Sequence, residues 1–272
     1  MFIRTTRNLI NKHLQYKPIN QSRYSIIGNN SFNFITSVTS ALFIPGNQEK
    51  MLNKSLHIHS DVLVPDCEDS VPNHEKNKAR ELISSFLIKN KESLKNKVIF
   101  PRINAVETDY FICDTNKLFT YDVLSIVSGF TIPKIDTIHD IEKIDDLLTK
   151  KEIELKFPIN KFKLIIWIES TLGIINMKDI YSKGKNRILA SAFGLEDYCN
   201  NLGITRTQDM KELEIVRNLH SITAHAFNIT ALDGSYVEFK NHEGLEKEIN
   251  YVKRLGYKGK FACNSSFSSR YY

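Results

Sequence analysis

Acidic residues are missing from the first 48 positions of this 272-residue chain, although a quarter of all its residues are charged. The same stretch holds five of the 37 basic residues, which leaves 32 Lys and Arg against 31 Asp and Glu in the remainder. The net charge of +6 and the pI near 9.0 therefore come largely from the N-terminal segment. Because the rest of the chain is nearly neutral, the basic pI does not indicate a nucleic-acid-binding surface.

Several features that would define a class of protein are also absent. The four cysteines are far apart and form no Cys-x-x-Cys pair, so neither a zinc site nor a disulfide framework is indicated. No apolar run approaches the ~18 residues that a membrane span requires, and we expect no membrane partner. The sequence contains neither a Gly-x-Gly-x-x-Gly fingerprint nor a Gly-x-x-x-x-Gly-Lys phosphate loop. These absences argue against a dinucleotide-binding or P-loop domain.

Residues 1–39 have the composition of a mitochondrial transit peptide. They are rich in Asn, Ser and Thr, basic and free of acids. Residues 1–10 can form a basic amphipathic turn or two, and Arg23-Tyr24-Ser25 is similar to a matrix-processing site. The alternative is an Asn-rich tail without a targeting function. We interpret the segment as a leader for import into the mitochondrial matrix, followed by a single domain over residues 40–272.

From residue 40 onward, short apolar runs alternate with amphipathic stretches. The amphipathic stretches repeat apolar residues at helical spacing, for example over residues 79–87 and 208–227. Eight strand–helix steps of this length favour a (β/α)₈ TIM barrel over an open doubly wound sheet. The predicted strands are 41–45, 61–65, 98–103, 130–135, 164–168, 188–193, 230–233 and 260–263.

The eighth predicted step ends early. Only residues 264–272 follow the last strand, and this Ser-rich stretch is too short for a closing helix. We therefore expect a C-terminally truncated barrel that lacks its last helix. Its apolar flank beside the first and eighth strands would then be covered by a partner chain, or the chain would be a truncated gene product.

Two of the predicted strands lead into acids. The run 164–168 is followed by Glu169, and the run 188–193 is followed by Gly194 and then Asp197. In a (β/α)₈ barrel the carboxyl ends of the strands meet at the active face. We therefore expect Glu169 and Asp197 to share a divalent cation. Either acid alone is better explained as a favourable charge at a helix N-terminus, but the pair favours a metal site.

Basic residues follow two other strands. Arg102 lies at the end of the third strand, where its planar fork is suited to binding a substrate carboxylate; the alternative is an ordinary ion pair. Asp66, Glu68 and Asp69 follow the second strand, and we expect them to orient neighbouring groups. Lys134 is placed to neutralise them. No histidine has a partner at metal-ligand spacing, and we assign none to the site.

Six motifs, in this order, resemble those of the citrate lyase beta subunit family, within the larger aldolase/citrate lyase superfamily. Together they cover roughly residues 40–263, and the family's fold is the barrel that the periodicity predicts. The motifs are Leu42-Phe43-Ile44-Pro45-Gly46-Asn47, Asp66-Cys67-Glu68-Asp69, Arg102-Ile103-Asn104, Pro133-Lys134, Glu169-Ser170-Thr171-x-Gly173, and Phe193-Gly194-x-Glu196-Asp197 followed by Leu202-Gly203.

The resemblance implies a magnesium-dependent lyase that cleaves a carbon–carbon bond in a hydroxyacyl-CoA. Citramalyl-CoA would give acetyl-CoA and pyruvate. By position, Glu169 and Asp197 would be the Mg²⁺ ligands, consistent with the few carboxylates that this ion takes from proteins. The family also implies a homotrimer. Substrate-binding roles would fall to Phe43, Lys50, Lys54, Arg102, Cys263 and Asn264.

The chain departs from the family at its end. Cys263-Asn264-Ser265 stands where the family has Ile-His-Pro, and the family's closing helix and C-terminal lid have no counterpart. Because that lid carries the family's catalytic Asp, we leave the general acid unassigned. Two alternatives therefore stay open: a catalytically inactive truncated homologue that binds metal or acyl-CoA, and a metal-dependent pyruvate aldolase that acts on free acids.

Overall fold

The computed structural model describes residues 38–207, 209–238 and 240–263. Nearly all of the predicted leader, Asn264 and the predicted truncation after the eighth strand lie outside these residues. In the described part of the chain, no helix is both long and apolar enough to cross a membrane.

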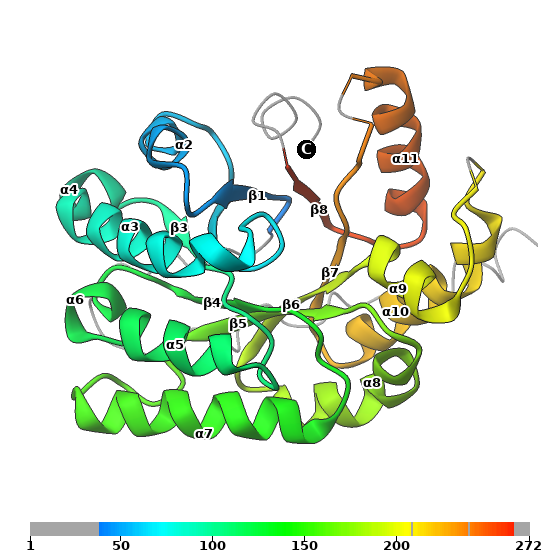
Figure 1. Cartoon of the computed structure of the whole chain (residues 1–272). Helices are drawn as coiled ribbons and strands as arrows, with labels where there is room; N and C mark the ends of the chain where they lie inside the picture. Colours follow the sequence, from blue (N-terminus) through cyan, green and yellow to red (C-terminus); the bar gives the residue numbers. More distant parts are fainter. Residues whose placement is uncertain (1–37, 208, 239, 264–272) are drawn as a thin grey trace, which may run out of the picture. The chain divides into compact units, whose positions relative to one another are not determined.

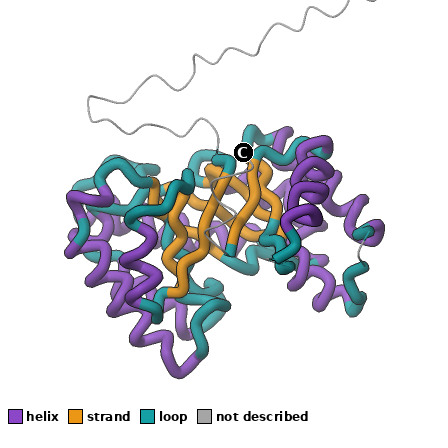
Figure 2. Tube along the Cα trace, turned by 90° about the horizontal axis from the view of Figure 1, so that it is seen from above, coloured by secondary structure: helices purple, strands orange, loops and turns teal. Residues whose placement is uncertain are grey.

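Eight parallel strands form the centre of the domain (Figures 1 and 2). They are hydrogen-bonded in the order β3-β2-β1-β8-β7-β6-β5-β4, so that β1 and β8 pair side by side. The predicted (β/α)₈ barrel is confirmed. The strands are β1 Ser40–Pro45, β2 Val62–Asp66, β3 Val98–Ile99, β4 Gly129–Ile132, β5 Lys163–Ile168, β6 Ile188–Phe193, β7 Thr230–Asp233 and β8 Gly259–Ala262.

The segment just after β3 joins β2 to β4 and so closes the barrel. Arg102 forms parallel bridges with Asp66 on one side and Thr131 on the other. The backbone N–H of Thr131 donates to the carbonyl of Pro101 at 2.9 Å. The strand predicted over residues 98–103 stops at Ile99 in regular form because Pro101 has no N–H to donate. The backbone nevertheless continues far enough to link β2 to β4.

Helices cover the outer side of the strands (Figures 1 and 2). Two of them, α5 and α6, lie between β3 and β4, where the sequence pattern did not predict helices. The α-helices are α2 Glu49–Ser55, α3 Lys76–Lys89, α4 Lys91–Leu94, α5 Asp109–Leu118, α6 Tyr121–Leu124, α7 Ile138–Glu154, α8 Thr171–Gly184, α9 Leu195–Leu202, α10 Glu214–Ala226 and α11 His242–Arg254. Short 3₁₀ turns at Asn73–Glu75 and Lys211–Leu213 precede α3 and α10.

Alternation along the strands separates the two faces of the barrel. In β5, Leu164, Ile166 and Ile168 belong to the apolar core that the strands share with the helices. The residues between them point to the interior, because successive side chains of a strand face opposite sides. Trp167 and Glu169 therefore share the interior face, and Glu169 lies just beyond the end of the strand.

Candidate active site

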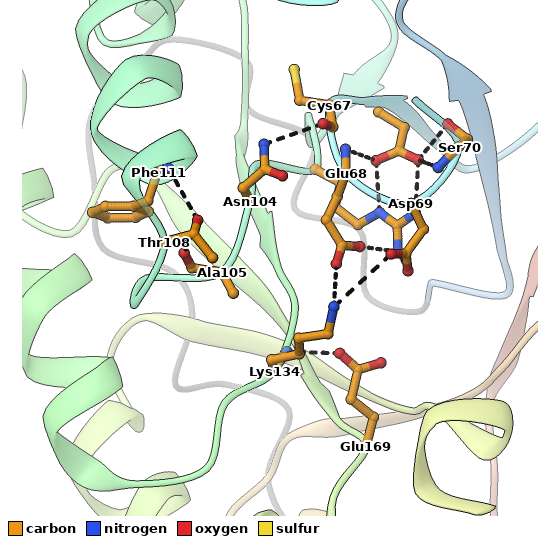
Figure 3. Close-up of polar contacts among 12 residues, drawn as sticks. Cys67, Glu68, Asp69, Ser70, Asn104, Ala105, Thr108, Phe111, Lys134 and Glu169 are labelled. Carbon is orange, nitrogen blue, oxygen red and sulfur yellow. Dashed lines mark hydrogen bonds and ion pairs between the residues drawn. The ribbon is translucent and has the colours of Figure 1, made fainter. Parts of the chain in front are cut away.

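Glu169 is a buried carboxylate at the carboxyl end of β5. Its Oε1 accepts a hydrogen bond from the backbone N–H of Lys134 at 2.8 Å (Figure 3). Lys134 has a φ of 54°, in the left-handed region that non-glycine residues rarely adopt. Strain of this kind is concentrated at functional sites, and here it belongs to the residue whose N–H holds Glu169.

Asp197 lies next to Glu169 because β5 and β6 are neighbours. The backbone N–H of Gly194, which directly follows β6, donates to the carbonyl of Ile168 at 3.0 Å. Asp197 then occupies the first turn of α9, a position that favours negative charge. A Cβ at Gly194 would lie 2.5 Å from Oε2 of Glu169, so only glycine allows the start of α9 to approach this carboxylate so closely.

The electrostatics around Glu169 favour a cation. Burial raises the pKa of Glu169 to about 8, and the nearby charges of Asp197 and Glu68 add to the effect. A cation that binds between these carboxylates would relieve their mutual repulsion. Among the described residues, no group of three or more His, Cys, Asp or Glu surrounds a single point. Two carboxylates still fit Mg²⁺, which keeps several waters and takes further ligands from substrate.

Arg102 is fixed by acids on three sides. Its Nε and Nη2 each donate to Asp66 at 2.7 Å, as a bidentate pair. Its Nη1 lies 2.8 Å from Oε2 of Glu68 and 3.4 Å from the exposed Asp69. The guanidinium also stacks 4.2 Å from the ring centre of Phe43. The fork that we expected to bind substrate is thus already paired with Asp66, and Nη1 is the edge that faces the exposed acid.

Lys134 links the arginine cluster to Glu169. Its Nζ donates to Oε1 of Glu68 at 2.7 Å, while its backbone holds Glu169 (Figure 3). Its Nζ also lies 3.9 Å from Asp69. The predicted neutralisation by Lys134 is therefore present for Glu68 and Asp69, whereas Asp66 is neutralised by Arg102. Burial raises the pKa of Glu68 to about 7, against the opposing effect of Arg102. Lys134 and Asp69, whose side chains are 46% and 56% exposed, are the charged groups of this cluster that solvent reaches most readily.

Three aromatic rings form the floor beneath these charges. Trp167 lies 5.7 Å from Phe43 and 4.5 Å from Phe261, and Phe43 lies 4.9 Å from Phe261, all measured between ring centres. The three rings come from β1, β5 and β8 and meet inside the barrel. Trp167 and Phe261 were not predicted as part of the site. The period-two alternation from Glu169 back to Trp167 is the signal that could have found the tryptophan.

The structure brings together Phe43, Arg102, Glu169 and Asp197, but it leaves other predicted residues apart. Lys50 and Lys54 are both exposed on α2. Cys263 is exposed just after β8, and its Sγ lies 3.8 Å from the carbonyl oxygen of Tyr236. Asn264 lies outside the described residues. Asn47, the last residue of the first family motif, donates to Glu75, and Gln48 occupies the N-cap position of α2.

A (β/α)₈ barrel that gathers carboxylates and a buried arginine at the carboxyl ends of its strands defines a class of enzymes with the active site on that face. The sequence places the chain within this class. It belongs to the HpcH/HpaI aldolase/citrate lyase family, whose profile matches residues 39–265.

Two relatives illustrate the membership. The mitochondrial citramalyl-CoA lyase of Mus musculus is 29% identical over 254 residues, covering 90% of this chain and 71% of the relative. The citrate lyase subunit beta of Haemophilus influenzae is 31% identical over 225 residues, covering 83% and 75%. Relatives thus include both mitochondrial and bacterial proteins, and these two are named as lyases.

Solved structures confirm the fold. The citrate lyase beta subunit of M. tuberculosis, complexed with oxaloacetate and magnesium, matches with a TM-score of 0.67 at 22% identity, covering 86% of this chain and 94% of that one. The Haloferax volcanii malate synthase lead(II) complex matches with a TM-score of 0.76 at 20% identity, covering 85% and 70%.

Proposed function

We propose that this protein is a magnesium-dependent carbon–carbon lyase that cleaves citramalyl-CoA, or a similar β-hydroxyacyl-CoA, to acetyl-CoA and pyruvate. The observation that carries the proposal is the pair of carboxylates at neighbouring strand ends, Glu169 and Asp197, beside the buried Arg102. Family membership supports the reaction class, and the names of the relatives support the substrate.

Glu169 and Asp197 would hold the magnesium ion. When bound, Mg²⁺ would supply Lewis acidity at the substrate oxygen that becomes the keto group of pyruvate. The Lys134 backbone N–H restrains one oxygen of Glu169, so that the carboxylate keeps a single orientation. The protein thus holds its ligands in place before substrate arrives, which lowers the cost of reorganisation.

Arg102 would bind a carboxylate of the substrate through its Nη1 edge. Asp66 occupies the other edge and, together with the Phe43 ring, fixes the plane of the guanidinium. The 3.4 Å contact to exposed Asp69 is the weakest of the arginine's contacts, and a substrate carboxylate would replace it. Glu68 contacts the same nitrogen at 2.8 Å, so the substrate carboxylate would share Nη1 with this buried acid while Asp66 orients the guanidinium.

The aromatic floor would keep water away from the reacting carbon. In the proposed cleavage the substrate hydroxyl gives its proton to a general base, the carbonyl of pyruvate forms as the carbon–carbon bond breaks, and the electron pair of that bond passes to the thioester as an enolate. That enolate carbon must then take up a proton from a general acid. Phe43, Trp167 and Phe261 present only apolar surface and the indole N–H to this space, which limits premature exchange with solvent.

Location and assembly form part of the proposal. Residues 1–39 would direct the protein to the mitochondrial matrix, as the name of the mouse relative also suggests. Lys50 and Lys54, four residues apart on α2, would meet the CoA phosphates. A homotrimer is the assembly that the family resemblance implies.

The purified full chain tests the proposal with citramalyl-CoA as substrate. We expect pyruvate and acetyl-CoA in equal amounts with Mg²⁺ and neither in EDTA, measured by a coupled dehydrogenase assay and by chromatography. Glu169→Gln should abolish both turnover and Mg²⁺ binding in calorimetry. The control Glu107→Gln, at an exposed acid, should change neither.

Two results would overturn the proposal that this protein is a citramalyl-CoA lyase. Cleavage of free citramalate without cleavage of its CoA thioester would identify a pyruvate aldolase. Magnesium binding by the wild type without turnover of either substrate would identify an inactive homologue.

A further inference from the structure

Helix α10 exposes large apolar side chains along its outer face. Ile215 is 83% exposed, Ile222 is 65% exposed and Leu219 is 45% exposed. Ala226, one turn further on, is exposed as well. Single exposed apolar residues are ordinary, but a continuous row of them indicates a surface that another molecule covers.

The spacing of this row indicates what kind of surface fits it. The four residues are separated by four, three and four positions, which is the heptad spacing of a coiled-coil seam. They lie on the side opposite the residues that α10 buries against the barrel, which include Val216, His220 and Ala224. The helix therefore has two apolar faces, and only one of them is buried in the fold of a single chain. A second helix with the same spacing is the natural occupant of the other.

We propose that the α10 seam, defined as Ile215, Leu219, Ile222 and Ala226, packs antiparallel on the same seam of a second copy of this chain. The seam is symmetric about its midpoint. A two-fold axis there would place Ile215 opposite Ala226 of the second copy and Leu219 opposite Ile222. Each contact would therefore occur twice across the axis, as in any isologous interface.

The residues beside the seam are compatible with self-pairing. Asn218, Thr223 and His225 flank it, so no two carboxylates or two lysines would face each other across the axis. Antiparallel packing also sets the N-terminus of each helix, with its exposed Glu214, near the C-terminus and His225 of the other. Opposite helix dipole ends and opposite partial charges would then meet.

The neighbouring helix α8 widens the seam. A three-turn seam alone offers less than the ~800 Å² per partner that a specific interface buries. Ile174 of α8 packs with Val216 of α10 in one apolar cluster, and Ile175, the next residue along α8, is 78% exposed. Ile215 and Ile175 are the two most exposed large apolar residues in the described part of the chain. Their concentration on adjacent helices supports a single interface and not scattered exposure.

The mass of the full chain in solution tests the proposal without reference to activity. A two-fold contact predicts an even number of copies: a dimer, or a hexamer if the chain also forms a homotrimer. We expect Ile222→Glu to halve the mass measured by light scattering and analytical ultracentrifugation, because it buries two carboxylates in the seam. The matched control is Ile153→Glu on α7, also 65% exposed, which should leave the mass unchanged.

Circular dichroism should show that both variants are folded. A wild-type mass of one or three copies, an unchanged mass for Ile222→Glu, or an equal loss for Ile153→Glu would overturn the proposal. The register has its own test. Leu219→Glu mixed with Ile222→Lys should restore the even-numbered assembly that each loses alone, since the new carboxylate of one copy would face the new ammonium of the other; no recovery would overturn the antiparallel arrangement.

Discussion

Arg102 combines structural and chemical roles in one residue. Its backbone bridges β2 and β4, so the barrel closes through it. Its side chain neutralises Asp66 and contacts Glu68, both of them buried. Removing the arginine would leave two carboxylates in a low-dielectric interior without their main counter-charge.

We predict that Arg102→Met lowers the free energy of unfolding by about 3–5 kcal/mol, the usual cost of breaking a buried ion pair. Urea denaturation followed by circular dichroism measures it. The comparison is Lys117→Met, which breaks a partly exposed pair with Glu81 and should cost less than about 1 kcal/mol. Equal losses in the two variants would show that the Arg102 cluster contributes no more than a surface pair.

At the scale of a single element, α8 fixes where Glu169 sits. Ser170 directly follows Glu169 and caps the helix, its Oγ accepting from the N–H of Gly173 at 2.9 Å. The same hydroxyl donates to Asp136, which lies just after β4. A change in this cap therefore alters the start of α8 and the residue next to it.

We expect Ser170→Ala to cost about 1 kcal/mol of stability, the typical value of an N-cap, and to weaken Mg²⁺ binding by about tenfold. Thr108→Ala removes the cap of α5, whose side chain accepts from Phe111 N–H at 3.3 Å. This control should cost a similar stability but leave Mg²⁺ affinity unchanged. Thermal melts and calorimetry separate the two effects. Unaltered Mg²⁺ affinity in Ser170→Ala would show that the cap does not position Glu169.

Across the whole molecule, a buried polar chain ties the last strands to three helices. His220 of α10 contacts the Oγ of Ser191 in β6 at 3.0 Å and the hydroxyl of Tyr257 at 3.1 Å. Tyr181 of α8 donates to Ser191, and Tyr257 donates to the carbonyl of Arg217. The hydrogen bonds are all satisfied by a neutral imidazole with its proton on Nδ1.

Arg217 continues the network into a buried ionic group with Asp233, Glu248 and Lys260.

The buried His220 network predicts how the stability of the folded protein depends on pH. Burial lowers the pKa of His220 from its ordinary 6.5 to about 3. Between those values the unfolded chain binds a proton that the folded protein does not, so stability is complete above pH 6.5 and falls below it. The loss attributable to His220 is up to about 1.4 kcal/mol per pH unit. The raised pKa values of Glu68 and Glu169 have the opposite sign, since they lower the stability of the metal-free protein as pH rises.

His220→Gln keeps a donor and an acceptor but cannot be protonated. Although it should be less stable than wild type at pH 7.5, its free energy of unfolding should fall less steeply between pH 6.5 and 5. Urea titrations at several pH values measure the slope. Parallel slopes in wild type and variant would show that His220 is not the group that titrates.

The sequence predicted the barrel because its apolar runs recur with the period of strand–helix units, and local pattern determines local structure. It missed α5 and α6, which are short and weakly periodic, and it extended β3 past Pro101. For the site, it predicted Glu169 and Asp197 from their positions after apolar runs. It could not find Phe261 as part of the floor, because nothing near this residue in the chain distinguishes it from a core aromatic.

The sequence by itself thus determined the order of strands and helices, the acids that end them, and the family to which the chain belongs. Only the tertiary structure decided which charges meet: that Asp66 takes the fork of Arg102, that the backbone of Lys134 holds Glu169, and that α10 turns an apolar row outward. The physical reason is that the periodicity of apolar residues depends only on residues close together in the sequence. Pairing instead depends on distances between residues tens of positions apart, which exist only after the barrel closes.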